Sequence, residues 1–445
     1  MVLSSSPSCV SPPPLGLKRP RRHLLTVALA LGAALLLPAG GSRLARAEPS
    51  ACAAKIRQIY DSNTGNLVAA ELSLPALRRL PSAGEWGPHL EIRLGLQGRR
   101  APESLETLTV GQYNLLDLVA GEKLADGAAD AARLAGAPLP PWAKPERDVL
   151  GVAETILRAD PDVLVVEEVG SAEILAEFSR RHLKDRYEPV LIEGNGGGIH
   201  IGFLLKKDLP FDVEAQSFKN VATSAGTEPL FSRDLPVLVF RERGGDARGP
   251  PRFALAGTHF KSQRTSNPAT DTGAIRREQA EAAAEILAAY RKTLGPDAPI
   301  LLAGDFNEDL RHAPAFDSLR NRAGLRDSFD LAPASKSVDP RLRTTQTFHP
   351  RDGSPTVHSQ LDAILISGVS PELGVVREAQ VVPYLDSRGN IKPVPATIEQ
   401  RHENPSDHFM IRTVLDYRKM RTPRASVRPT ATTAATATAT PPPGP

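Results

Sequence analysis

A short apolar run that ends in Gly-Asp-Phe-Asn constrains this chain more than any other feature. Residues 300–303 predict a buried strand, which stops just before Asp305 and Asn307. A strand that ends in polar groups delivers them to the rim of a sheet, where binding and catalytic sites are usually built. Carboxylate and amide oxygens are also the donors that a hard divalent cation prefers. The feature predicts a layered sheet with a metal- and phosphate-handling site at its edge.

The same arrangement recurs elsewhere in the chain. Polar residues stand within two positions of an apolar run at Asn114, Glu168, His259, Asp362 and the adjacent pair Asp407-His408. Buried strands of a layered sheet end at a common rim, so side chains at their ends gather there. We therefore expect these groups to line one cleft.

Short apolar runs alternate with a few helical patterns over most of the chain. Strands are expected at residues 90–96, 108–113, 163–166, 201–205, 236–240, 253–257, 300–303, 363–366 and 409–415. Helices are expected at residues 51–60, 147–157, 171–184 and 272–290. The last of these has an Asp271-Thr272 cap and a Gly295-Pro296 stop. Short buried strands interleaved with helices predict an α/β protein whose sheets are covered by helices.

Residues 1–47 have the parts of an export signal. Basic residues lie within positions 18–22, a largely apolar run of 14 residues occupies 24–37, and Ala-Arg-Ala stands at 45–47. A membrane span is the alternative, but spanning needs about 20 apolar residues. The Arg21-Arg22 pair also fits a twin-arginine signal, so the export route stays open. We expect a cleaved signal and a periplasmic or extracellular protein without stable membrane insertion.

The cysteine content and the net charge limit the kinds of protein that the mature chain can be. Once residues 1–47 are removed, Cys52 is the only cysteine, so no intramolecular disulfide can form. The leader carries six basic residues and no acid, and residues 418–445 carry five basic residues and no acid. Because the whole chain has a net charge of +3, residues 48–417 carry −8. This acidic body fits a carboxylate metal site and argues against a broad basic face for nucleic acid.

Six segments in a consistent order carry a family resemblance. They are Tyr113-Asn114, Val166-Glu167-Glu168-Val169, Thr258-His259-Phe260-Lys261-Ser262, Gly304-Asp305-Phe306-Asn307, Ser359-Gln360-Leu361-Asp362 and Ser406-Asp407-His408. They resemble the motifs of the endonuclease/exonuclease/phosphatase superfamily, over residues 105–417. The resemblance implies two packed, mostly antiparallel β-sheets flanked by helices, the four-layer α/β sandwich of DNase I. It also implies phosphoester hydrolysis that depends on Mg²⁺, with Mn²⁺ or Ca²⁺ as alternatives.

The resemblance also divides the chain. Residues 105–417 would form the hydrolase domain, and residues 48–104 an N-terminal extension that the resemblance does not cover. The Pro-, Thr- and Ala-rich residues 418–445 predict a disordered tail.

The resemblance implies a metal site at Glu168, with Asn114 beside it and Asp407 as a further ligand. Mg²⁺ typically takes one or two carboxylates together with water and phosphate. The family usually has Gln before this Glu, whereas here Glu167 stands there. Glu168 is favoured by position, and the choice between the two stays open. The alternative role for Asp407 is to orient a neighbouring imidazole.

The resemblance assigns catalytic roles to five residues. Asp305 would orient or deprotonate the attacking water, and Asn307 would donate to the charge that develops on phosphorus. His408 would contact the attacked phosphate or activate water, and His259 would clamp the phosphate or protonate the leaving oxygen. Asp362 would fix the tautomer of a histidine that the sequence does not identify.

Two cations are candidates for substrate phosphate. Arg233 lies in a Ser-Arg-x-x-Pro segment that resembles one found before a central strand in nuclease members, and Arg suits bidentate phosphate binding. Lys261 could follow a substrate backbone. Either could instead form an ordinary surface contact.

Three functions remain open at this stage. The segment around His259, together with the export signal, most resembles secreted bacterial nucleases, so the first expectation is a monomeric nuclease that acts on nucleic acid, with DNA favoured over RNA. The second is a lipid or small-molecule phosphodiesterase or phosphatase. The residues around Asp362 lack the Trp and Arg of inositol-phosphatase members, which argues against that substrate. Neither Trp86 nor Trp142 lies in an obviously amphipathic hairpin, which argues against a membrane lipid. The third is a non-catalytic binding module that keeps the fold.

Overall fold

The computed structural model describes residues 55–60, 67–73, 91–96, 101–119, 121, 142–196, 198–226, 228–243, 251–265, 267–295, 298–334, 343–350, 354–369 and 371–421. The predicted export signal and residues 422–445 of the predicted tail lie outside these residues. Among the helices described, none has the length and apolar character needed to cross a membrane.

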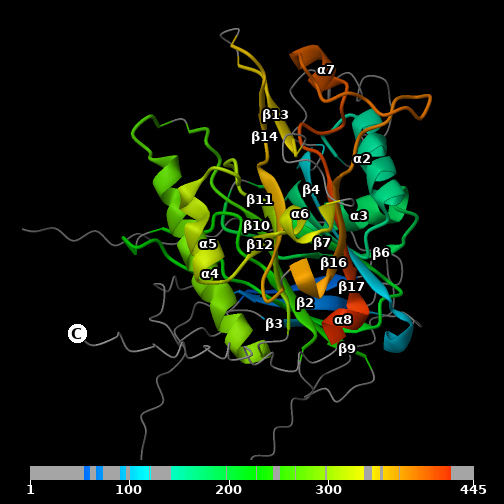
Figure 1. Ribbon diagram of the computed structural model, residues 1–445, viewed down its shortest axis with the longest axis vertical. Helices are drawn as coiled ribbons and strands as arrows, with labels where there is room; N and C mark the ends of the chain where they lie inside the picture. The colour runs from blue at the N-terminus through cyan, green and yellow to red at the C-terminus, as the bar shows by residue number, and fades with distance from the viewer. Residues whose placement is uncertain are drawn as a thin grey trace, which may run out of the picture. The chain divides into compact units, whose positions relative to one another are not determined.

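Two large β-sheets form the described body (Figure 1). The seven-stranded sheet has the order β12 (Arg326–Asp327), β15 (Asp362–Ile366), β11 (Ile300–Asp305), β10 (Phe253–His259), β9 (Val237–Glu242), β8 (Phe211–Gln216) and β3 (Glu91–Gly95). The six-stranded sheet has the order β16 (Val376–Val381), β17 (Ile411–Asp416), β4 (Thr107–Leu118), β5 (Val163–Val169), β7 (His200–Lys206) and β6 (Tyr187–Leu191). In these sheets β10–β11 and β4–β5 pair in parallel, and the other described pairs are antiparallel.

Helices cover the outer face of each sheet. The two parallel pairs are joined by crossover helices, α2 (Glu146–Ala159) between β4 and β5, and α4 (Thr272–Leu294) between β10 and β11. Together with α5 (Asp317–Asn321), α4 lies beside the seven-stranded sheet, while α2 and α3 (Ala172–His182) lie beside the six-stranded sheet (Figure 1). The layers therefore run helix, sheet, sheet, helix, which confirms the predicted four-layer α/β sandwich with mostly antiparallel sheets.

Alternating side chains build the core between the two sheets. On β10 and β11 the inner face carries Leu255, Leu301 and Ala303, and on β5 it carries Val163 and Val165. Successive strand residues point to opposite faces, so every second position reaches this core. The same alternation decides which polar residues at the strand ends point between the sheets.

The sequence located α4 correctly. The side chain of Asp271 accepts a hydrogen bond from Ala274 N over 2.9 Å and so caps the first turn. The helix ends at Leu294, four residues beyond the predicted end, and Gly295 follows with a φ of 94°. Glycine adopts this left-handed conformation without a steric penalty.

Two predictions near the ends of the domain were wrong. Of the helix expected at 51–60, residues 55–60 instead form β1 (Lys55–Tyr60), which pairs antiparallel with β2 (Leu67–Ser73), and residues 51–54 lie outside the described residues. The tail predicted at 418–445 starts too early, because α8 (Tyr417–Arg421) continues the fold. Its Met420 is buried in the core between the sheets, next to the buried Tyr417.

The extension at 48–104 contributes to the main fold. Its strand β3 agrees with the strand expected at 90–96, and it pairs with β8 at the edge of the seven-stranded sheet. The sequence did not indicate β6, β8 or β16, where polar residues interrupt the apolar pattern.

Gly304 is required by the close approach of two strands, and its replacement should be destabilising. A Cβ atom at Gly304 would lie 1.8 Å from the carbonyl oxygen of Thr258 on the neighbouring strand, and both positions are backbone-fixed. Gly304→Ala is therefore expected to lower the free energy of unfolding by about 3 kcal/mol or more, measured by urea denaturation.

The matched control for this substitution is Gly196→Ala. Among the described residues, its Cβ would meet Ser232 O at 3.9 Å, an ordinary contact, so this variant should unfold like the wild type. Equal stabilities for the two variants would contradict the strand-crowding argument.

Candidate active site

Three neighbouring strands of the seven-stranded sheet place one polar side chain each in a single row. His259 at the end of β10 is in register with Asp305 at the end of β11, and Asp305 is in register with Asp362 at the start of β15. Residues in register on adjacent strands point to the same face. His259 Nε2 lies 3.7 Å from Asp305 Oδ2, and all three side chains are buried. The row continues the inner face of the core, where apolar residues give way to polar ones.

The other sheet faces this row through Asn114 of β4. Asn114 Nδ2 donates to Asp305 Oδ2 over 3.2 Å and to Glu168 Oε1 over 3.1 Å. Asn114 Oδ1 accepts a hydrogen bond from Leu116 N over 3.0 Å. One buried amide thus joins a predicted metal ligand to the predicted catalytic carboxylate, across the gap between the sheets.

His408 enters the same cluster from the segment that precedes β17. Its Nδ1 lies 2.8 Å from Asp362 Oδ2, and its Nε2 lies 3.9 Å from Asp305 Oδ2. The Ser406 hydroxyl donates to Asn114 O over 2.8 Å and accepts from His408 N over 3.1 Å, which anchors the segment to β4. The histidine oriented by Asp362 is therefore His408, a pairing that the sequence left open.

The two imidazoles have opposite electrostatic environments. Burial opposes the charged form of His408, but the carboxylates of Asp362 and Asp305 outweigh it and hold the pKa of His408 well above its usual value. Burial lowers the pKa of His259 well below its usual value, and the nearby charge of Arg233 acts in the same direction. The two environments therefore favour the charged form of His408 and the neutral form of His259.

Asp305 is the acceptor at the centre of the cluster. Asn307 donates to it twice, from its backbone N to Oδ1 over 2.7 Å and from Nδ2 to Oδ2 over 3.2 Å. Burial raises the pKa of Asp305 to about 7; the charge of His408 lowers it, and Asp362 raises it further. Asn307 has a φ of 54°, a left-handed conformation that is uncommon outside glycine and clusters at functional sites.

A β-bulge sets the position of Glu168. The register of β5 shifts against β7 between Val166 and Val169, and Glu168 between them has a φ of 63°. A bulge re-aims a side chain that strict alternation would send to the other face. Glu168 Oε2 accepts a hydrogen bond from Asp117 N over 3.1 Å, and Oε1 accepts the bond from Asn114. Glu168 thus reaches the cleft by departing from the regular strand.

The donor set fits a hard divalent cation. The ligand atoms of Asp305, Asp362 and His408 all lie within 4.8 Å of one another, but His408 in its charged form has no lone pair for a metal. The predicted metal ligands outside this trio are Glu168, Asn114 and Asp407. Asp407 forms an ion pair with Arg401 at 3.0 Å through Oδ2, while its buried Oδ1 accepts no hydrogen bond from the described residues. A buried carboxylate oxygen without a donor suits a metal ion or its bound water. Of its two predicted roles, metal binding fits Asp407, because Asp362 already holds the His408 imidazole.

The two predicted phosphate-binding cations lie at the edge of this cluster. Arg233 is partly buried; burial lowers its pKa, while the negative charges of Glu168 and Asp305 act against that shift. Gly194 packs against the backbone of Arg233 and fixes its segment. Lys261 follows β10, and its Nζ lies 3.5 Å from Arg264 O. Within the described residues neither cation forms an ion pair.

The sequence profile of the Endonuclease/Exonuclease/phosphatase family matches residues 134–408. This match spans more than half of the chain and includes five of the six motifs that meet in the cleft. The chain belongs to this family. Members of the superfamily are phosphoester hydrolases, and the cluster of acidic, amide and imidazole groups at the strand ends is consistent with that chemistry.

Solved structures of similar fold include TDP2 from Caenorhabditis elegans, with 18% identity, a TM-score of 0.43 and coverage of 70% of this chain and 74% of that one. A mannosyl-6-phosphatase from Bacteroides thetaiotaomicron has 19% identity, a TM-score of 0.43 and coverage of 69% and 98%. The human Nocturnin catalytic domain has 16% identity, a TM-score of 0.45 and coverage of 71% and 94%. No curated protein matches the chain by sequence.

Sequence reasoning missed Gln112, which links two carboxylates of the family site. Its Nε2 donates to Asp362 Oδ1 over 2.8 Å and to Glu167 Oε2 over 3.0 Å. Burial, together with the nearby Asp362 and Asp305, raises the pKa of Glu167 well above its usual value. The signal was present in the strand alternation, since Gln112 lies two positions before Asn114 and so points to the same face.

Removing this buried amide should weaken both the fold and the site. Gln112→Met keeps a similar volume but leaves two buried carboxylates without their shared donor, so we expect a loss of about 1–3 kcal/mol in the free energy of unfolding. We also expect a lower kcat on bis(p-nitrophenyl) phosphate, because Asp362 loses one of its fixed contacts. The control is Glu167→Gln, whose amide oxygen can still accept from Gln112 and which should retain stability and activity. A Gln112→Met protein as active as this control would contradict the linking role.

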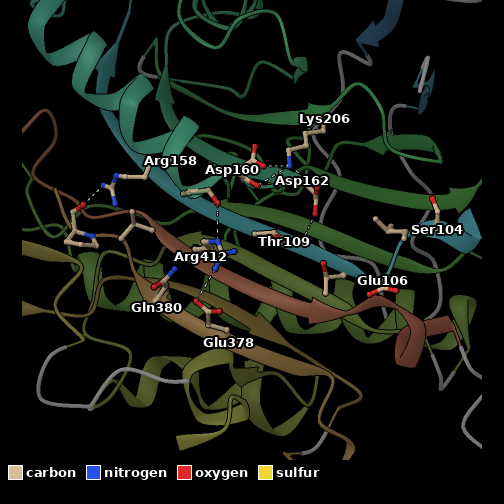
Figure 2. A pocket seen from close by; sticks show the side chains of 15 residues that line it. Ser104, Glu106, Thr109, Arg158, Asp160, Asp162, Lys206, Glu378, Gln380 and Arg412 are labelled. Carbon is tan, nitrogen blue, oxygen red and sulfur yellow. Dashed lines mark hydrogen bonds and ion pairs between the residues drawn. The ribbon is translucent and has the colours of Figure 1, made fainter. Parts of the chain in front are cut away.

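A separate cavity of about 790 Å³ lies at the opposite end of β4 (Figure 2). Its charged groups already have partners: Lys206 lies 3.0 Å from Asp160 and 3.1 Å from Asp162, and Arg412 lies 3.1 Å from Glu378. Arg158 donates to Pro383 O, and Glu106 pairs with Arg418 outside the cavity. No predicted site residue lines it. The cavity therefore has structural ion pairs but no group aimed at a ligand.

Proposed function

We propose that this chain is an exported, Mg²⁺-dependent endonuclease that hydrolyses phosphodiesters by in-line attack of water. One observation carries the proposal: Asp305 Oδ2 lies 3.2 Å from Asn114 Nδ2, 3.7 Å from His259 Nε2 and 3.9 Å from His408 Nε2. A single buried carboxylate surrounded by two imidazoles and an amide suits proton transfer to and from a reacting phosphoester.

Asp305 acts on the water in this proposal. Its carboxylate accepts the proton of the attacking water, and its pKa of about 7 is close to the operating pH that favours general-base catalysis. Asn307, held by its Nδ2 bond to Phe260 O over 3.1 Å, presents its amide to the negative charge that develops on phosphorus. The rigid contacts around both residues orient them before substrate arrives.

The two histidines have different roles in the proposed reaction. His408 carries a positive charge, its ring is fixed by Asp362, and its Nε2 can donate to a phosphate oxygen. His259 is neutral and buried, and among the described residues nothing hydrogen-bonds to its Nδ1. A neutral imidazole can hold the phosphate through its one N–H. To protonate the leaving oxygen it would first have to take up a proton, which its lowered pKa disfavours.

Glu168, Asn114 and Asp407 would hold the metal ion. Bound there, Mg²⁺ would neutralise negative charge on the phosphate as the reaction proceeds. Mn²⁺ accepts the same oxygen donors and should support activity.

Two features favour nucleic acid over a lipid as substrate. Arg233 and Lys261 offer positive charge at the cleft within an otherwise acidic body, which suits the phosphates that flank a scissile bond. Trp142, one of the two tryptophans, is 1% exposed and packs in the core, so it offers no surface for a bilayer.

Incubation of the purified protein with supercoiled plasmid, in Mg²⁺ or in EDTA, tests the proposal. Nicking that requires the metal would support an endonuclease. Absence of nicking, with hydrolysis of a phosphocholine lipid or a phosphomonoester, would move the assignment to the phosphodiesterase and phosphatase alternatives. Mass spectrometry of the protein secreted by a bacterial host tests export, since cleavage should leave Glu48 at the N-terminus.

A further inference from the structure

A hairpin next to the catalytic cluster exposes an aromatic ring. β13 (Gln346–Phe348) pairs antiparallel with β14 (Val357–Ser359), and the pair extends beyond the ends of the sheet strands (Figure 1). Phe348 is 42% exposed and stands in register with Val357, which is 47% exposed. Large apolar side chains are costly to expose, so an exposed aromatic beside a catalytic cleft suggests a contact surface.

The base of this hairpin is fixed to the catalytic groups. Gln346 forms a β-bridge with His408, and Asp362 N donates to Thr345 Oγ1 over 3.0 Å. Phe348 is two residues farther along the strand, which corresponds to about 7 Å from Gln346. The ring is therefore held at a short, defined distance from the imidazole that would contact the scissile phosphate.

A second loop brings a cation to the same ring. The Arg264 guanidinium lies 5.7 Å from the centre of the Phe348 ring, within cation–π range. The preceding residue, Gln263, donates from Nε2 to Asn307 O over 2.9 Å, so this loop is attached to the other side of the cluster. Within the described residues the Arg264 side chain forms no ion pair, so its charge is free to meet a phosphate.

We propose that Phe348 and Arg264 form a stacking platform for an unpaired base next to the scissile phosphate. The inference rests on the proposed nuclease function and adds a substrate class, namely single-stranded nucleic acid or locally unpaired nucleotides. The aromatic face stacks on the base, as in sequence-tolerant single-strand binding, and the guanidinium contacts the adjacent phosphate.

Charge and shape favour this occupant over a lipid surface. The ring lies beside the Arg264 guanidinium, and just beyond β13 and β14 the Thr356 hydroxyl and His349 Nδ1 lie 2.9 Å apart in a hydrogen bond. A bilayer-inserting hairpin needs a continuous apolar face. In β13 and β14 the exposed large apolar side chains are Phe348 and Val357, and the cation beside the ring matches a base and its phosphate.

Two small diesters with the same leaving group give a direct test. Thymidine 5′-(p-nitrophenyl phosphate) carries a base, and methyl p-nitrophenyl phosphate does not. Phe348→Leu keeps an apolar side chain but removes the π-face, so we expect kcat/KM on the thymidine ester to fall about ten-fold while the methyl ester is unaffected. Phe348→Tyr keeps a π-face and should retain the wild-type preference for the thymidine ester.

Controls separate stacking from folding and from membrane binding. Leu150→Ala removes a side chain that is 51% exposed on α2, and kcat/KM of this variant should match the wild type on both esters. Melting temperatures of all variants should match the wild type, because Phe348 lies at the surface. Sedimentation with phosphatidylcholine and phosphatidylserine vesicles tests the lipid alternative. Under that alternative, Phe348→Leu would still bind the vesicles, because leucine is also apolar.

A second variant gives a readout that does not depend on turnover. In EDTA, the fluorescence of Phe348→Trp should be quenched by a single-stranded oligonucleotide beyond the quenching seen in the wild type, and less by a blunt duplex. Arg264→Ala should weaken oligonucleotide binding and reduce its salt slope by about 0.7.

The outcomes distinguish the two hypotheses. A wild type that hydrolyses both diesters, with Phe348→Leu unchanged on the thymidine ester, would overturn the platform and leave the nuclease proposal standing. Vesicle binding that persists in Phe348→Leu, without a preference for the thymidine ester, would likewise overturn it. A wild type inactive on plasmid and on both diesters would overturn the proposed function and this inference with it.

Discussion

Replacement of Asp305 by asparagine should lower kcat by about 1,000-fold or more, the largest effect expected in this protein. The substitution keeps the shape of the side chain but removes the base. Asn114 and Asn307 both donate from their side-chain amides to Oδ2 at 3.2 Å, and the backbone N of Asn307 donates to Oδ1 at 2.7 Å, so the new amide nitrogen must face at least one of these donors. The rate of plasmid nicking in saturating Mg²⁺ measures the effect.

The control for this substitution is Asp317→Asn. Asp317 lies on α5, has a side chain that is 58% exposed, and pairs with Arg320 on the surface. It should nick plasmid at the wild-type rate. Activity of Asp305→Asn within about ten-fold of the wild type would contradict the role of Asp305 as general base. His408→Ala should show a comparable loss, because it removes the charged imidazole held by Asp362.

Replacement of Glu168 by glutamine should raise the Mg²⁺ concentration needed for half-maximal activity by at least about ten-fold. The variant has one amide oxygen in place of the two carboxylate oxygens that accept from Asn114 and Asp117, and it loses the negative charge that a hard cation requires. Titration of the nicking rate with Mg²⁺ measures the shift, and calorimetry of Mg²⁺ binding gives it without substrate.

Glu167→Gln is the matched control, one residue away. Glu167 is fully buried and accepts from Gln112, and burial together with Asp362 and Asp305 raises its pKa well above the usual value, which disfavours its charged form. Its replacement should leave the Mg²⁺ requirement nearly unchanged. A shift for Glu167→Gln with none for Glu168→Gln would show that the adjacent carboxylate is the ligand.

Much of the fold could be predicted from the sequence because its central strands are buried. A buried strand leaves an uninterrupted apolar run, as in residues 163–166 and 300–303, and a long helix leaves caps such as Asp271. Edge and outer strands leave weaker patterns. β8 and β16 mix polar and apolar residues since one face meets solvent or helices, and β1 was mistaken for a helix because its strand character depends on pairing with β2.

The residues of the candidate site could also be predicted from the sequence only in part. The polar residues that end the central strands were visible as interruptions of apolar runs, and alternation alone sends His259, Asp305 and Asp362 to one face. The same alternation places Gln112, two positions before Asn114, on the face that carries the site. It was missed because a lone amide inside a strand pattern is no motif by itself.

By itself the sequence determined which chemical groups this protein has at its strand ends and that they belong to one family of hydrolases. Only the tertiary structure decided which histidine Asp362 orients, since that depends on how the segment before β17 returns to β15. It also decided that Glu168 reaches the cleft while Glu167 stays inside the core. The reason is the β-bulge in β5, which breaks the two-residue alternation and is stabilised by contacts with neighbouring strands rather than by local sequence.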